Sequence, residues 1–182
     1  MNRVLSWFGS ALFGVAIAIL VQIFLFVPTR VAGHSMSPTL RDTEYVVVAK
    51  WPHVFREVPN YGDIVIIDSR VNRNRTIIDD ITEPVTNFYH AINHIDTHTV
   101  WVKRVIGKAG DTIEIKEGMV YRNGEPLEEK YIPEKMNDPY KSYTVPDGMV
   151  FVMGDNRNHS GDSRIIGSVP LNHVLGKVAI AL

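Results

Sequence analysis

The 26 residues from Val4 to Thr29 contain no charged side chain, and this stretch constrains the chain more than any other feature. As an α-helix rising about 1.5 Å per residue, it would cover roughly 39 Å, more than the ~30 Å hydrocarbon core of a bilayer. Trp7 near its start is typical of an interfacial anchor, and Pro28 near its end marks the helix exit. The stretch therefore predicts a membrane anchor over residues 1–29.

A cleaved secretory signal peptide is the alternative for this stretch. Arg3 supplies a minimal positive n-region, and Val31-Ala32-Gly33 provides a small-residue cleavage site. The apolar region of a signal peptide usually has about 7–15 residues, which is much shorter, so an uncleaved anchor is favoured. No second apolar run of spanning length follows, and we expect a single crossing. Arg3 and Arg30 flank the stretch almost symmetrically, so the positive-inside count leaves the orientation open.

Residues 30–182 are expected to form one mainly β, antiparallel domain. Short β-branched runs are separated by Gly and Pro, and no long segment has a 3.6-residue period. Glu117-Gly118 and Asn123-Gly124 predict tight turns between neighbouring runs. Residues 68–99 are polar and predict a long insertion between two strands. The predicted strands are residues 45–49, 63–67, 100–106, 112–116, 119–122, 149–153 and 174–182.

Composition excludes several classes of function. The chain has no cysteine, which excludes disulfide scaffolds and thiol catalysis. Its 19 basic and 20 acidic residues give a net charge of −1, which argues against binding nucleic acid through bulk electrostatics. His90, His94 and His98 have the spacing of metal ligands on a helix, but the threonines around them favour histidines in a solvated loop. We expect neither a metal nor another cofactor.

Ser35 follows the apolar stretch after only five intervening residues and lies in the segment GHSMSPTL. Glycine and proline allow a tight turn there, and the serine alone is readily explained as a turn residue. His34 is a conceivable base for it. Adjacent residues of an extended chain point in opposite directions, which disfavours this Ser–His pair.

Lys103 and Arg104 are embedded in the otherwise apolar run of residues 100–106. An edge strand whose long side chains reach water is one explanation. The other is functional, because a desolvated lysine loses its proton readily and then acts as a general base. A buried arginine instead needs a carboxylate partner. The segment Gly154–Arg164 is either a solvated loop or the source of that carboxylate and of a hydroxyl that orients the lysine.

These segments together resemble the type I signal peptidases, which are serine peptidases with a Ser–Lys dyad. The motifs occur in the family's order, and a single membrane span resembles the compact form of Gram-positive bacteria. Thr43-Glu44 departs from the family's usual Gly-Asp. The matching residues are Ser35-Met36-x-Pro38-Thr39, Lys103–Gly107 followed by Gly110-Asp111, Gly154–Arg157, and Ser160-x-Asp162-Ser163-Arg164, with Gly62–Val65 as a weaker match.

The resemblance implies a role for each matching residue. Ser35 would be the nucleophile and Lys103 the general base, with Ser160 hydrogen-bonded to the lysine. Arg104 would pair with Asp155, and Arg164 with Asp162. The oxyanion hole would comprise Ser35 and Gly33, where some family members have a serine in place of the glycine. The residues expected to line the pockets for small substrate side chains are Val31, Met36, Leu40 and Val102.

The resemblance thus implies a membrane-bound serine endopeptidase with a barrel-like catalytic domain. It would act as a monomer on the extracytoplasmic side of the cell membrane and remove signal peptides from preproteins after small residues, as at Ala-x-Ala sites. Its partners would be signal peptides and the lipid bilayer, without nucleic acid. One alternative is an anchored β domain that binds preproteins or partners without cleaving them. Another is a self-cleaving Ser–Lys regulator, which the apolar anchor disfavours.

Overall fold

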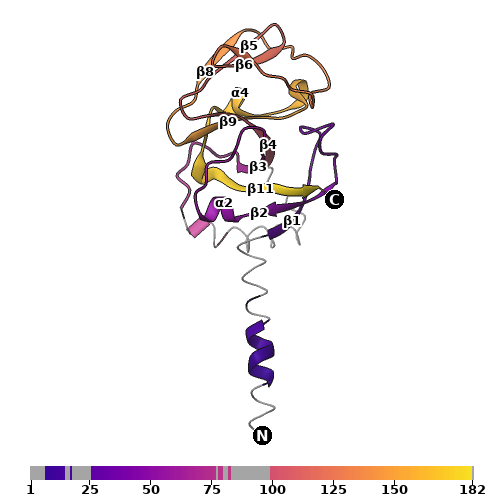
Figure 1. Cartoon of the computed structure of the whole chain (residues 1–182), viewed down its shortest axis with the longest axis vertical. Helices are drawn as coiled ribbons and strands as arrows, with labels where there is room; N and C mark the ends of the chain where they lie inside the picture. The colour runs from indigo at the N-terminus through magenta and orange to yellow at the C-terminus, as the bar shows by residue number, and fades with distance from the viewer. Residues whose placement is uncertain are drawn as a thin grey trace.

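The computed structural model describes residues 7–14, 17, 26–76, 78–79, 82 and 99–181. Residues 7–14 are helical and lie apart from a β domain (Figure 1). Within these described ranges, no helix is both long and apolar enough to cross a membrane. Most of the predicted anchor lies outside the described residues, as do His90, His94 and His98 of the proposed metal spacing.

The predicted helix exit at Pro28 is wrong, because Phe26–Arg30 form strand β1. This strand pairs antiparallel with β2 (Tyr45–Ala49), from Phe26 opposite Ala49 to Arg30 opposite Tyr45. Strand β1 lies at the edge of its sheet, where a proline without an N–H is tolerated. The β domain therefore begins at Phe26 rather than at residue 30.

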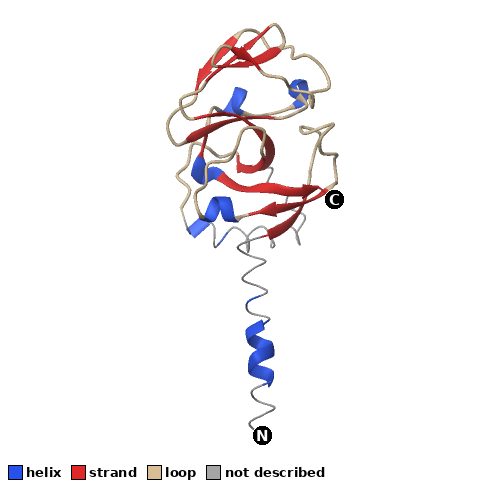
Figure 2. Cartoon of the chain, viewed as in Figure 1, coloured by secondary structure: helices blue, strands red, loops and turns tan. Residues whose placement is uncertain are grey.

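Two antiparallel sheets make up the domain (Figure 2). The larger has the strand order β1-β2-β11-β3-β4-β9-β10 and the smaller β7-β6-β5-β8. With β1 and β10 at its two edges, the larger sheet is open rather than a closed barrel.

The other strands of the larger sheet are β3 (Ile64–Asp68), β4 (Val100–Lys108), β9 (Met149–Met153), β10 (Val169–Pro170) and β11 (Val174–Ala181). The smaller sheet comprises β5 (Thr112–Lys116), β6 (Met119–Arg122), β7 (Glu125–Pro126) and β8 (Lys141–Thr144). The β domain also contains the short helices α2 (Trp51–Val54) and α4 (Ser163–Ile166) and the 3₁₀ turns η1 (Arg157–His159) and η2 (Leu171–His173).

Every predicted β-branched run forms a strand, with ends shifted by two residues at most. Both predicted turns are confirmed, because Glu117-Gly118 has φ values of 56° and 75° and Asn123-Gly124 of 54° and 83°. Strands β1, β7, β8 and β10 were not predicted. Strands β7 and β10 have two residues each, and β8 is polar and mostly exposed, so none of them has the alternating apolar pattern of a half-buried strand.

The insertion between β3 and β4 begins after Asp68 and is closed at its base. The Ser69 N–H donates to the carbonyl oxygen of Thr99 at 2.8 Å, and the Ser69 hydroxyl donates to the same oxygen at 2.9 Å. These bonds continue the antiparallel pairing of β3 with β4, in which Asp68 lies opposite Val100. The two ends of the insertion therefore meet at the sheet.

A buried carboxylate organises the first residues of the insertion. Asp68 is fully buried and accepts hydrogen bonds from the side chains of Arg70, Arg73 and Arg75 at 2.7 to 3.3 Å. Burial opposes ionisation of Asp68, but the hydrogen bonds and charges of the arginines hold its pKa well below the usual range. The segment after β3 is thus fastened to the sheet by its own charges.

Two strand glycines offer a test of how tightly the sheets are packed. A Cβ added at Gly176 of β11 would lie 2.7 Å from the carbonyl oxygen of Ala49, whereas one at Gly107 of β4 would meet the Ile113 side-chain end at 2.8 Å. A side-chain end can swing away and a backbone oxygen cannot. We predict that Gly176→Ala lowers the free energy of unfolding by about 1–3 kcal/mol, and by more than Gly107→Ala. Urea denaturation of both variants measures this, and equal losses would contradict it.

Candidate active site

Ser35 is held in a turn between β1 and β2 whose apolar side chains point into the domain. Met36 and Leu40 are each 1% exposed and belong to a hydrophobic cluster with core residues of β2 and β3. Burial of each such side chain favours the folded state by about 1.5–3 kcal/mol. The half-buried Ser35 is thus presented from a turn that is fixed on the sheet.

The segment that follows β9 holds the backbone of this turn from the other side. The Asn156 N–H donates to the Ser35 carbonyl oxygen at 3.0 Å, and its side-chain amide donates to the carbonyl oxygen of His34 at 3.1 Å. A Cβ added at Gly154 would collide with both the Ser35 carbonyl oxygen and the Ser160 hydroxyl. Glycine is therefore required at position 154 for the two segments to approach each other.

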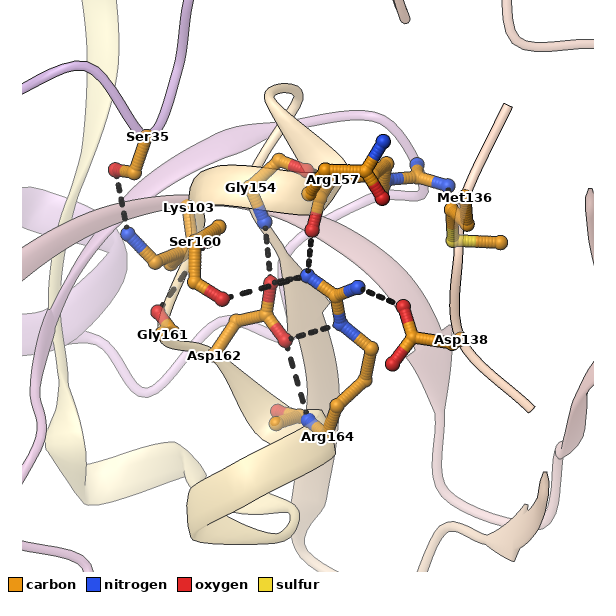
Figure 3. Close-up of polar contacts among 12 residues, drawn as sticks. Ser35, Lys103, Met136, Asp138, Gly154, Arg157, Ser160, Gly161, Asp162 and Arg164 are labelled. Carbon is orange, nitrogen blue, oxygen red and sulfur yellow. Dashed lines mark hydrogen bonds and ion pairs between the residues drawn. The ribbon is translucent and has the colours of Figure 1, made fainter. Parts of the chain in front are cut away.

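Lys103 of β4 reaches Ser35 from the sheet, in the pairing that the resemblance implies. Its Nζ donates to Ser35 Oγ at 2.8 Å (Figure 3) and to the Val102 carbonyl oxygen at 2.8 Å. The lysine is 3% exposed, and the Trp101 ring lies 5.5 Å from the amine. In the part of the chain that the structure describes, the exposed His34 ring makes no hydrogen bond to Ser35, so the alternative Ser–His pair is not formed.

The electrostatic surroundings of Lys103 suit a general base. Burial lowers the pKa of its amine to about 8, an effect that Arg164 reinforces and that the carboxylates of Asp162 and Asp155 partly oppose. An amine with this pKa is largely neutral at mildly alkaline pH and can then accept a proton from Ser35.

Both predicted ion pairs are formed beside the lysine. Arg104 Nε and Nη2 donate to the two carboxylate oxygens of Asp155 at 2.8 and 2.6 Å. Arg164 is forked on Asp162, with both nitrogen–oxygen distances at 2.8 Å (Figure 3). Thr39 belongs to the serine motif but had no expected role. Its hydroxyl donates to Asp155 at 2.5 Å, which links the serine turn to the first pair.

Ser160 lies at the site, but its hydroxyl is directed differently from the prediction. The hydroxyl donates to the carbonyl oxygen of Gly161 at 3.3 Å, and among the described residues it makes no hydrogen bond to Lys103 (Figure 3). The Ser160 hydroxyl and the Ser35 carbonyl oxygen nevertheless both lie where a Cβ on Gly154 would be. Ser160 is therefore a neighbour of the pair in this structure rather than a partner of the lysine.

The backbone N–H groups of Gly33 and Ser35, the two residues expected in the oxyanion hole, differ in whether they already have a hydrogen-bond acceptor. The Gly33 N–H already donates to Asp42 Oδ1 at 2.9 Å, so a part for Gly33 in the oxyanion hole stays a prediction. Across the described ranges, the Ser35 N–H has no hydrogen-bond acceptor. The Ser35 N–H is therefore available to a substrate oxygen.

The residues predicted to line a substrate pocket lie mostly in the core. Val31, Met36 and Leu40 are only 1 to 3% exposed and form part of one hydrophobic cluster. Val102 packs against that cluster and is partly exposed. Val31, Met36 and Leu40 therefore present little surface to a substrate, and the pocket assignment stays a prediction.

Glu129 and Tyr131 lie near the site and carry no signal in the sequence, whereas Arg157 belongs to a matching motif but had no expected role. Glu129 and Arg157 form a buried forked ion pair with nitrogen–oxygen distances of 2.6 and 2.7 Å. The Tyr131 ring lies 3.9 Å from the Arg104 guanidinium. Glu129 stands between Glu128 and Lys130, in a run that resembles a solvated charged loop, and only the tertiary fold distinguishes it.

Known proteins that resemble this chain were found among families, curated sequences and solved structures. The family model described as "Signal peptidase, peptidase S26" matches residues 4–182. "Probable signal peptidase I-1" of Synechocystis sp. is 34% identical over 160 residues, which cover 88% of this chain and 72% of that protein. "Signal peptidase I" of Bacillus licheniformis is 34% identical over 173 residues, which cover 90% of this chain and 79% of the relative. A crystal structure of a signal peptidase I from Enterococcus faecalis V583 aligns with a TM-score of 0.47 and 26% identity, covering 68% of this chain and 98% of that one.

The Lys103 amine should titrate far below an ordinary lysine. We predict a midpoint near pH 8 for its ε-carbon resonance, against about 10.4 for an unperturbed lysine, because burial disfavours the charged amine. Asp155→Asn removes a carboxylate that favours the charged form and should lower the midpoint further. NMR titration of protein labelled at the lysine ε-carbons measures both, and Lys103→Arg identifies the resonance. A midpoint above pH 10 would contradict the assignment of a desolvated amine.

Proposed function

The chain belongs to the signal peptidase family, peptidase S26, and we propose that Ser35 and Lys103 carry out its reaction, the hydrolytic removal of signal peptides from preproteins. The family match spans residues 4–182, and the relatives are one-third identical over about nine-tenths of the chain. The protein is therefore a hydrolase, and the alternative of a domain that binds without cleaving is set aside. The observation that supports the two residues is the 2.8 Å between Ser35 Oγ and a buried lysine amine.

The geometry supports acyl transfer in two stages. In the first, the neutral Lys103 amine takes the Ser35 proton while Oγ attacks the scissile carbonyl carbon. The Ser35 N–H stabilises the oxyanion, and the lysine ammonium then protonates the departing amine of the mature protein. In the second, Lys103 removes a proton from a water molecule that attacks the acyl-enzyme. The bond to Ser35 breaks, the lysine ammonium returns a proton to Oγ, and the signal peptide leaves with a new carboxylate.

The ion pairs beside the lysine support its role as a base. Unpaired carboxylates at Asp155 and Asp162 would hold the amine protonated, and each is instead bound by an arginine at 2.6 to 2.8 Å. With a pKa of about 8, roughly a tenth of the enzyme would carry the neutral amine at pH 7. This fraction increases as the pH rises.

The closed space behind Ser35 supports a preference for small substrate side chains. The buried side chains of Val31, Met36 and Leu40 fill the core behind the nucleophile. Because these side chains are already packed, a bulky substrate residue placed against them would overpack the core, which typically costs about 1–3 kcal/mol. We therefore propose cleavage after small residues, as at Ala-x-Ala sites.

Attachment to the cell membrane is supported by the apolar N-terminal stretch and by the surface next to it. The uncharged residues from Val4 run directly into β1. On β1, β2 and β11, the apolar side chains of Phe26, Tyr45 and Ile180 are 41 to 57% exposed. We propose a single-pass anchor that holds the domain at the extracytoplasmic surface. One chain supplies both Ser35 and Lys103, so we further propose that the protein acts as a monomer.

Two substitutions test the catalytic pair. Ser35→Ala should reduce cleavage of a preprotein with an Ala-x-Ala site to background, because the proposed reaction has no other nucleophile. Lys103→Arg should be equally inactive, because a guanidinium does not deprotonate. Wild-type kcat/KM should rise about tenfold between pH 7 and pH 9 as the amine loses its proton. Lys130→Arg, at an exposed position, is the matched control. Substantial activity of Lys103→Arg would refute the dyad.

The contribution of the membrane can be measured with a shortened chain. Because Phe26–Arg30 form an edge strand, the shortened chain must begin at Phe26 to preserve the sheet. It should cleave peptides in detergent like the full-length enzyme but process preproteins embedded in vesicles at least about tenfold more slowly, since tethering raises the effective concentration. Equal rates on vesicles would show that the anchor only retains the enzyme.

A further inference from the structure

The segment between β7 and β8 directs two side chains toward the arginines that flank the catalytic residues. The side chain of Glu129 is 4% exposed and Tyr131 is half-buried, whereas the side chains of Glu128 and Lys130 are 81% and 85% exposed and pair with each other at 3.0 Å. The segment thus has an inner side, formed by residues 129 and 131, and an outer side in solvent.

Glu129 is connected to the backbone of the nucleophile through Arg157. The two carboxylate oxygens of Glu129 accept hydrogen bonds from Arg157 at 2.6 and 2.7 Å, and the arginine side chain is fully buried. Arg157 Nε donates to the Gly154 carbonyl oxygen at 3.0 Å. Gly154 is the residue against which the Ser35 carbonyl oxygen rests. A buried charge-assisted fork of this kind is strongly directional, so it fixes where the Gly154 backbone lies.

Tyr131 is connected to the general base through Arg104. The edges of the Arg104 guanidinium are bound by Asp155 and by the Gly62 carbonyl oxygen, the latter at 2.8 Å. The Tyr131 ring covers one face of the guanidinium at 3.9 Å. Asp155 thus binds the edge of the guanidinium, and the Tyr131 ring holds its face.

The two inner residues are also joined to each other. The Tyr131 hydroxyl donates to Glu129 Oε1 at 2.6 Å. Burial and the Glu129 carboxylate raise the pKa of the Tyr131 phenol, so the hydroxyl remains a donor at every pH at which the enzyme works. Glu129 and Tyr131 therefore act as one unit that contacts both Arg157 and Arg104.

We propose that Glu129 and Tyr131 are positioning residues, which set the geometry of Ser35 and Lys103 through Arg157 and Arg104. This inference rests on the proposed function. Neither residue touches the reacting atoms. Their effect is to keep Gly154 against the serine turn and Asp155 on its arginine, so that Oγ and Nζ stay in contact.

Kinetics distinguish positioning from a purely structural role. Loss of positioning lowers kcat with little change in KM, whereas loss of stability lowers only the fraction of folded enzyme. A second signature is the pH profile. Asp162, Asp155 and Arg164 act on the charge of Lys103. When Arg104 is held less firmly, Asp155 is less neutralised, and the Lys103 amine should lose its proton at higher pH.

The test uses the full-length protein with Glu129→Gln, Tyr131→Phe and Tyr131→Leu. We expect kcat per folded molecule to fall at least fivefold in Glu129→Gln and Tyr131→Leu and at least twofold in Tyr131→Phe, with KM within twofold of wild type. The pH midpoint of kcat should move upward in Tyr131→Leu. Matched controls are Glu128→Gln, at an exposed neighbour, and Tyr140→Phe, whose exposed hydroxyl donates to Glu114 at 3.2 Å. Both should retain wild-type kcat.

Each result either supports or overturns the proposal. Folded variants with wild-type kcat and an unchanged pH midpoint overturn it. If Glu129→Gln or Tyr131→Leu does not fold, Tyr131→Phe decides alone, because it removes only one hydroxyl. Ser35→Ala, assayed alongside, distinguishes failure of the positioning role from failure of the proposed function. If it is inactive while the Glu129 and Tyr131 variants behave like wild type, only the positioning role fails. If Ser35→Ala still cleaves, the proposed function itself fails.

Discussion

Keeping one amine out of water is the requirement on which the rest of the site depends. Lys103 is nearly fully buried, and burial lowers its pKa to about 8. In water the same amine would be protonated at neutral pH and would be unable to take a proton from Ser35. The Trp101 ring lies 5.5 Å from the amine, and the serine turn contacts it through Ser35 Oγ at 2.8 Å. A β domain suits this purpose because β4 carries the lysine between two neighbouring strands of a rigid sheet.

Burial also makes an unpaired charge energetically costly, and in this domain the buried carboxylates near Lys103 are paired with arginines. Asp155 and Asp162 each have an arginine partner, and Arg157 has Glu129. Such buried pairs contribute little net stability, because desolvation offsets their attraction, yet breaking one leaves a charge that nothing balances. Their value lies in direction, since each forked pair allows a narrow range of positions for the segments that it joins.

The sequence predicted most of the features that depend on local residue patterns. Alternating β-branched runs located the long strands, and the charged pair inside an apolar run located Lys103 and Arg104. It did not indicate that Phe26–Arg30 form a strand, because an apolar edge strand directly after an apolar stretch has no boundary in its composition. It also could not reveal the contact of Glu129 with Arg157, which lie 28 positions apart and meet only after both sheets have formed. The sequence likewise could not reveal the direction of the Ser160 hydroxyl, because the folded backbone positions the Gly161 carbonyl oxygen to which it donates.

The closed base of the insertion between β3 and β4 has an evolutionary consequence. Ser69 and Thr99 are already hydrogen-bonded, so the entropy of joining the ends is lost once, whatever the chain between them contains. Each doubling of that chain then adds only about 0.6 kcal/mol of closure entropy. The carboxylate of Asp68 secures the entry point through arginines that lie within seven positions of it, independently of the more distant part of the insertion. Descendants of this protein can therefore change the length of the insertion at a small cost in closure entropy, while β3 and β4 remain paired.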